Sequence, residues 1–177
     1  MTSTISITQD NLTTALRGWL LSVIAGEVIA AQQNRVAMPA GPFCQITPLF
    51  MRALSTDRAS YVDPGVNPGT ESHSRSTQWT AQLDFYGSTA ADNAAIVATL
   101  IRTDTTCTYF AGLGLDMQPL YAGEPKQTSM ITGEQQYLSR WTLEFVAQFN
   151  PVVQAAQDFA ASLRIGLADI DVVFPPT

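Results

Sequence analysis

Two segments of the sequence share a regular alternation of apolar and polar side chains, and this shared pattern restricts the fold most. In residues 141–149 the odd positions are apolar, from Trp141 to Phe149, and in residues 79–85 the odd positions follow the same rule. A period of two is typical of a strand with one buried face. We therefore expect the two segments to pair in one antiparallel sheet. Their predicted core residues are Trp79, Leu83, Phe85, Leu143 and Phe145.

Two helices are predicted to pack on this sheet. The first spans residues 8–32, because Thr8 is a suitable N-cap and Asp10 places a negative charge in the first turn. The second follows Gly87, with Ser88 or Thr89 as its cap. Apolar residues recur at helical spacing in both segments. They are Leu12, Leu16, Trp19, Leu20, Val23 and Ile24 in the first, and Ala90, Ala94, Val97, Leu100 and Ile101 in the second.

The remaining segments predict strands and loops. Residues 43–54 form a strand that lies at an edge or carries a bulge, because Pro48 cannot donate to a sheet ladder. Residues 56–76 contain two Pro-Gly pairs and predict a long irregular loop, which is a candidate contact site. A short strand is expected near residues 116–121, and a second mobile loop covers residues 126–134.

The C-terminal residues 161–174 predict a strand or arm. Ile170, Val172 and Phe174 alternate with Asp169 and Asp171. Such a strand completes its own sheet or adds to the sheet edge of a neighbouring subunit. Together these elements predict one α+β domain over residues 1–177, with a mostly antiparallel sheet, flanking helices and long loops.

Composition and charge restrict the possible partners. Charged residues make up only 14% of the chain and the net charge is -6, whereas soluble domains usually carry about 25% charged residues. No basic run is present, so specific binding to nucleic acid is not expected. The most apolar stretch is shorter than a membrane span and contains Glu27. The first residues show no secretory signal, which predicts cytoplasmic assembly.

No residue pattern supports catalysis, a cofactor or a metal. The Gly87-Ser88 turn lacks the further glycines of a phosphate loop or nucleophile elbow. His73 is the only histidine and lies in the predicted loop, while Cys44 and Cys107 lack metal-site spacing and are expected to be reduced. Asp84 and Glu144 are the one alternative, because two carboxylates that face each other across two strands are typical of a small hydrolase.

Three motifs give the chain a resemblance to a known family. They are Asn34-Arg35 followed by Pro39, the block LDFYGSTAADNA, and the block EQQYLSRWTLEF. Their order along residues 12–175 resembles that of the neck and tail-terminator proteins of tailed bacteriophages. The resemblance implies a structural virion protein, not an enzyme, that forms a ring, usually hexameric, at the neck.

Such a ring ends the tail tube and joins it to a head connector or collar protein, with the tail sheath as a further possible partner. DNA passes through its lumen without specific binding. A neighbouring collar or head-tail joining ring, and a capsid-side or baseplate protein, remain alternatives. We expect partner contacts at residues of the predicted loops and of the C-terminal segment: Arg58, Tyr61, Val62, His73, Arg75, Lys126, Ile170, Val172 and Phe174.

Overall fold

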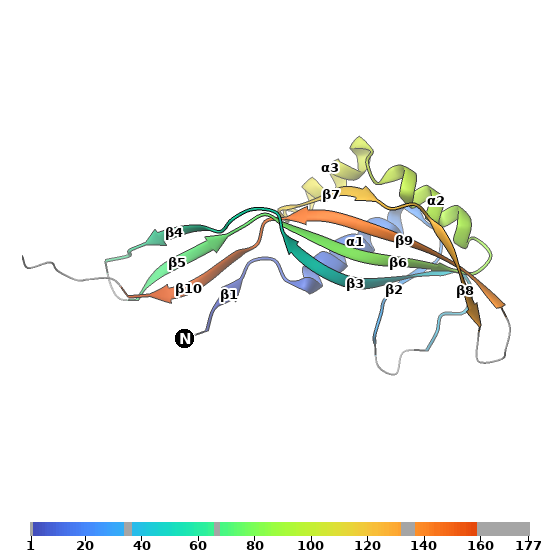
Figure 1. Cartoon of the computed structure of the whole chain (residues 1–177), viewed down its shortest axis with the longest axis horizontal. Coiled ribbons are helices and arrows are strands. Elements are labelled where there is room, and N and C mark those ends of the chain that lie inside the picture. The colour runs from blue at the N-terminus through green and yellow to red at the C-terminus, as the bar shows by residue number, and fades with distance from the viewer. Residues whose placement is uncertain (1, 34–36, 66–67, 132–136, 159–177) are drawn as a thin grey trace, which may run out of the picture.

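The computed structural model describes residues 2–33, 37–65, 68–131 and 137–158. It shows an elongated α+β domain in which a helix-covered body continues into a projecting β-sheet (Figure 1). We call the projecting sheet the arm. The predicted C-terminal strand at 161–174 lies outside the described residues, together with Ile170, Val172 and Phe174.

The body contains a six-stranded sheet. Its order is β2-β3-β6-β9-β7, and β8 also pairs with β9. All pairings are antiparallel except that of β2 with β3. The strand bounds are β2 Glu27–Ala30, β3 Phe43–Ala53, β6 Thr77–Tyr86, β7 Met117–Ala122, β8 Lys126–Ile131 and β9 Tyr137–Phe149.

The predicted pairing of the two alternating segments is confirmed. Leu83 lies directly across from Leu143, and Ala81 lies across from Phe145, so the apolar positions of β6 and β9 share one face. The predicted strand at 43–54 is also confirmed as β3. Its ladder with β6 shifts register between Pro48 and Phe50, which is the bulge that Pro48 predicts.

Three helices pack on the apolar face of this sheet: α1 Gln9–Val23, α2 Ala90–Leu100 and α3 Asp104–Gly112. The rings of Trp19, Phe110 and Phe145 meet at centroid distances of 6.1 to 6.5 Å, which joins α1 and α3 to β9. Trp79 meets Phe145 edge-on at 6.0 Å. All five predicted core residues of the sheet are buried in this cluster.

The arm is a four-stranded sheet with the order β1-β10-β5-β4. Its strands are β1 Thr4–Ile5, β4 Arg58–Val62, β5 Gly69–Ser74 and β10 Val152–Gln157. Three arm strands continue three body strands along the chain: β3 leads into β4, β5 into β6, and β9 into β10. The neighbours keep their order across this junction, because β5 lies between β4 and β10 as β6 lies between β3 and β9.

The arm corrects the predicted loop at 56–76. This segment is mostly the β4 and β5 hairpin, which also pairs with β10. The predicted mobile loop at 126–134 is wrong in the same way for its first six residues, which form β8 and pair with β9. Neither segment shows the alternation of a strand with one buried face. β4 and β5 pair with each other and β8 pairs with β9, while β10 adds the one partner that is distant in the sequence.

The first helix starts as predicted but ends earlier. Thr8 and Asn11 form a capping box at its N-terminus, and the helix ends at Val23 rather than near residue 32. Gly26 has φ +117°, and a Cβ there would lie 2.5 Å from the carbonyl oxygen of Pro42. After the helix the chain turns at this glycine and then pairs as β2 with β3. Helix α3, capped by Thr103, was not predicted from the sequence.

Candidate assembly surfaces

The face of the six-stranded sheet that the helices leave open contains a buried carboxylate, Asp84. Arg140 donates to its Oδ1 from Nε at 3.1 Å and Nη2 at 3.0 Å, and Thr142 donates to the same oxygen at 2.7 Å. Gln82 donates to Oδ2 at 2.8 Å. Both carboxylate oxygens are therefore occupied by donors from β6 and β9. This arrangement ties the two strands together on the side without helices.

The hydrolase hypothesis expected Glu144 to lie across from Asp84. This expectation is wrong, because Thr142 is the cross-strand partner of Asp84 and Glu144 lies across from Gln82. Glu144 is also exposed, whereas Asp84 is almost completely buried and bonded to Arg140. The pair therefore lacks the facing geometry on which the acid–base interpretation depended.

The turn after β6 is a packed connection. Gly87 adopts φ +97° and lies against Pro42, where a Cβ would be 3.0 Å from the Pro42 Cα. Thr89 is the N-cap of α2, as expected, but its side chain makes no cap hydrogen bond. Its hydroxyl instead accepts from the side-chain amide of Asn93 at 3.3 Å. The strand-to-helix turn is shaped by close backbone packing.

Both cysteines are free thiols, as expected. Cys44 lies on β3 inside the core, and its burial raises the pKa of the thiol far above the usual value, with Asp84 adding to the effect. A thiol that stays protonated is a poor nucleophile. Among the described residues, no group of three or more His, Cys, Asp or Glu side chains could hold a metal ion.

One face of the arm carries four neighbouring polar side chains: Asp57, Tyr61, Glu71 and His73. His73 contacts Asp57 through Nδ1 at 2.5 Å and Glu71 through Nε2 at 2.8 Å. Tyr61 lies directly across from Glu71 on the neighbouring strand, and hydrogen bonding to this carboxylate is the main cause of a raised pKa at Tyr61. The hydrogen bond to Asp57 is the main cause of a raised pKa at His73. Carboxylates on both ring nitrogens favour the doubly protonated imidazolium.

An apolar groove of about 550 Å³ lies on the same side of the molecule, where the arm meets the body. Its apolar lining comes from the N-terminal segment, from β3 and from the connection between β9 and β10. His73, Asp57 and Arg75 line its polar side. The apolar residues that line it are Ile5, Ile7, Met51, Phe149, Pro151 and Val153.

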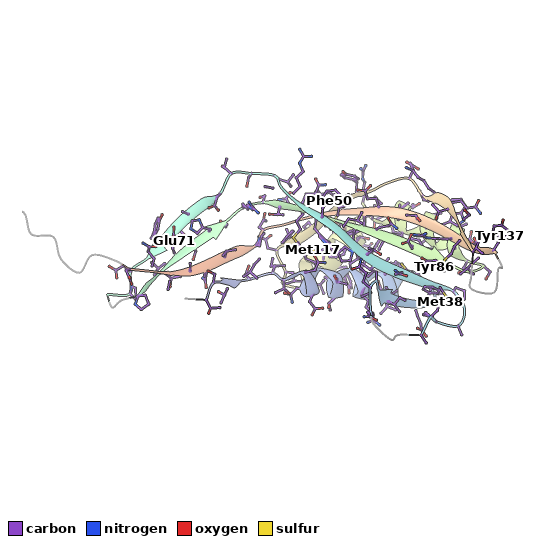
Figure 2. The ribbon with its side chains drawn as sticks, turned by 60° about the horizontal axis from the view of Figure 1, so that its bottom comes forward. Met38, Phe50, Glu71, Tyr86, Met117 and Tyr137 are labelled. Atoms are coloured by element: carbon purple, nitrogen blue, oxygen red, sulfur yellow. The ribbon has the colours of Figure 1, made fainter. Side chains whose placement is uncertain are left out.

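The strand β3 exposes apolar side chains along an open edge. β6 pairs along one side of β3, but β2 pairs on the other side only with residues 43–46, so the described part of the chain provides no strand on that side of residues 48–53. Leu49, Phe50 and Met51 are 47%, 51% and 48% exposed. Figure 2 shows Phe50 midway along the molecule, between Glu71 on the arm and Tyr137 at the far end. The edge continues into β4, where Tyr61 and Val62 are also exposed.

The opposite edge of the same sheet is formed by β7 and β8, which pair with successive halves of β9. Leu120, Tyr121 and Ile131 are its exposed large apolar residues. Exposed Asp116 and Glu124 flank β7, and Lys126 begins β8. Among the residues that the structure describes, the body therefore has two open edges, and they lie on opposite sides of one sheet.

The residues predicted as partner contacts fall in two places. Arg58, Tyr61, Val62, His73 and Arg75 gather on the arm and at its junction with the body. Lys126 lies apart from them, on the β7–β8 edge. The sequence reasoning missed the exposed side chains at 49–51, although Pro48 was a signal that this strand has an open edge.

The structure defines the chain as an α+β subunit with a projecting arm and two open sheet edges. A family model described as phage neck terminator protein matches residues 10–174, and the chain belongs to this family. A search of the curated proteins finds no match. The protein is therefore a structural neck protein of a phage virion, which interacts with other tail or head proteins. No described helix is long and apolar enough to cross a membrane.

Proposed function

We propose that the protein assembles into a ring of six copies at the neck of a tailed phage. In this proposal the ring ends the tail tube and provides the surface on which the head connector or collar protein docks. The observation that carries the proposal is the family match, which spans residues 10–174 and so includes the body and the arm strands β4, β5 and β10.

Two features of the subunit support this function. The arm extends the molecule well beyond its helix-covered body, so one subunit can contact a neighbour or a second ring through a surface separate from its core (Figure 1). The low content of charged residues also suits extensive burial between subunits. A net charge of -6 per copy disfavours adhesion of DNA to a channel wall.

The first test is the mass of the purified protein in solution, measured by light scattering alone and after addition of tail tubes from its phage. The expected result is a species of six times 19.1 kDa, free or bound to the tube end. A chain that stays a single subunit under both conditions contradicts the ring.

The second test places the protein in the virion. Electron microscopy of particles that carry a labelled chain should show the label at the junction of tail tube and head connector. A label at the baseplate or within the capsid contradicts the neck function. A label on a separate collar beside the tube end supports the collar alternative.

A further inference from the structure

We propose that neighbouring copies in the ring dock through the two open edges, the β3 edge of one copy against the β7–β8 edge of the next. This inference rests on the proposed ring function and assigns its subunit contact. The β3 edge is defined by residues 48–54, and the β7–β8 edge by residues 116–131.

The first argument is the placement of the edges. β3 and β7 lie toward opposite sides of the six-stranded sheet, with β6 and β9 between them. A closed ring requires two different surfaces on each subunit, which meet head to tail. Two edges of one sheet meet this requirement, and their contact continues the sheet from one copy into the next.

The second argument is the apolar surface on both edges. Leu49, Phe50 and Met51 on the β3 edge are each about half exposed. Leu120 and Tyr121 are exposed on the β7–β8 edge. Exposed apolar residues on an unprotected edge strand are typical of a surface that pairs with another chain. Contact between the two edges removes both sets from water.

The third argument is charge. The β3 edge carries Arg52, which is exposed and has no salt bridge among the described residues. The β7–β8 edge carries exposed Glu124 and Asp116, with Lys126 as its one positive charge. A basic edge and a net acidic edge on the same chain attract between copies.

The same charges select a ring over a two-fold dimer. In a two-fold contact through β3, the edges of two copies run past each other and bring Arg52 of one copy near Arg52 of the other. Like charges that face each other across neighbouring strands are destabilising. The ladders of the body place Arg52 level with Gln118, through Gln78 and Gln148. A head-to-tail contact that continues the sheet therefore places Arg52 near exposed Asp116 of the next copy, two residues before Gln118.

Two prolines restrict the backbone pairing. Pro48 on β3 and Pro119 on β7 each lack a backbone N–H, so neither can donate to a ladder with a neighbouring copy. The contact is therefore assigned to residues 49–53 on the β3 edge. Side-chain packing of the apolar residues is expected to dominate it.

The test is a charge exchange between the two edges. Arg52→Glu and Asp116→Arg are each expected to raise the protein concentration needed for rings by about tenfold or more, because each creates a repulsive contact at every interface. The double variant is expected to recover assembly. Arg52→Lys and Asp116→Glu keep the charges and serve as matched controls. Analytical ultracentrifugation measures the assembly, and thermal unfolding checks that each subunit is folded.

The outcomes separate this inference from the proposed function. If the unmodified protein makes rings and neither charge reversal weakens them, the edge contact is wrong while the ring function stands. If both single variants lose rings and the double variant does not recover them, the assignment of Arg52 to Asp116 is overturned. If the unmodified protein makes no rings, even with tail tubes, the proposed function itself fails.

Discussion

Arg140 and Asp84 form a two-donor ion pair across β6 and β9, with both Arg140 nitrogens directed at the same carboxylate oxygen. The Arg140 guanidinium also lies over the ring of Tyr86, 5.8 Å from its centroid, and Tyr86 stacks on Phe43 at 4.5 Å. The pair therefore belongs to a cluster that joins the three central strands on the face without helices.

Asp84→Asn is expected to destabilise the subunit by about 2–4 kcal/mol, because it leaves the donors of Arg140 and Thr142 without a carboxylate in a buried site. Glu144→Gln is the matched control on the same face, since Glu144 is exposed, and its effect is expected within about 0.5 kcal/mol. Urea unfolding measures both. Equal effects from the two substitutions contradict a structural role specific to Asp84.

Leu83→Ala is expected to cost about 2–5 kcal/mol, since Leu83 is fully buried between the sheet and the helices. Leu49→Ala removes the same side chain from the open edge of β3, and we expect less than about 1 kcal/mol in the single subunit. Denaturant unfolding at low protein concentration compares the two variants. A loss at Leu49 that matches the loss at Leu83 shows that the edge is already covered in the free subunit.

Gly87→Ala is expected to destabilise by about 1–3 kcal/mol, because alanine is strained at a φ of +97° and its Cβ meets the Pro42 backbone. Gly112→Ala provides the comparison at the end of α3, where no atom lies within 4 Å of the added Cβ. That change is expected to be neutral or to stabilise by up to about 1 kcal/mol. Thermal unfolding of both variants tests the contrast, and a neutral Gly87→Ala contradicts it.

His73 is expected to titrate above its ordinary pKa of 6.5, with Asp57 as the main cause. Because the folded pKa lies above the unfolded one, the stability that His73 adds to the arm is complete below about pH 6.5 and is lost as the pH rises through the folded value. NMR can follow this pKa without ambiguity, since the chain has one histidine.

Asp57→Asn is the variant that tests the cause, and it is expected to lower the His73 pKa toward 6.5. Asp63→Asn is the control, because Asp63 lies beyond β4 and accepts from the backbone of Gly65. A His73 pKa at or below 6.5 in the unmodified protein shows that the ring nitrogens are not held by the two carboxylates in solution.

The sequence predicted the body of the fold because its two central strands bury one face and expose the other. That asymmetry fixes both the type and the register of β6 and β9, and it also identified Leu83 and Phe145 as core residues. The arm gave no such signal. Ser60, Thr70 and Ser72 are small and polar, and the partner strand β10 lies about eighty residues further along the chain, so local pattern could not reveal the pairing.

The end of α1 and the exposed side chains at residues 49–51 of β3 were missed for a related reason. Residues 24–31 are apolar enough to suit a helix or a buried strand, and the features that select the strand are tertiary: the close approach of Gly26 to Pro42 and the pairing of β2 with β3. The run at Leu49–Met51 likewise resembles a buried strand. The run is exposed because β2 is short and pairs only with residues 43–46 of β3. This depends on the tertiary structure and cannot be read from the run itself.

The unbroken strand order between body and arm has a mechanical consequence. β6 and β9 continue into β5 and β10 along the long axis of the molecule, so tension applied at the far turn of the arm runs parallel to these strands (Figure 1). The ladder between β6 and β9 is then loaded in shear, where many hydrogen bonds share the force, and not in peeling, where they open one at a time. The subunit is therefore expected to resist extension along the direction in which its arm projects.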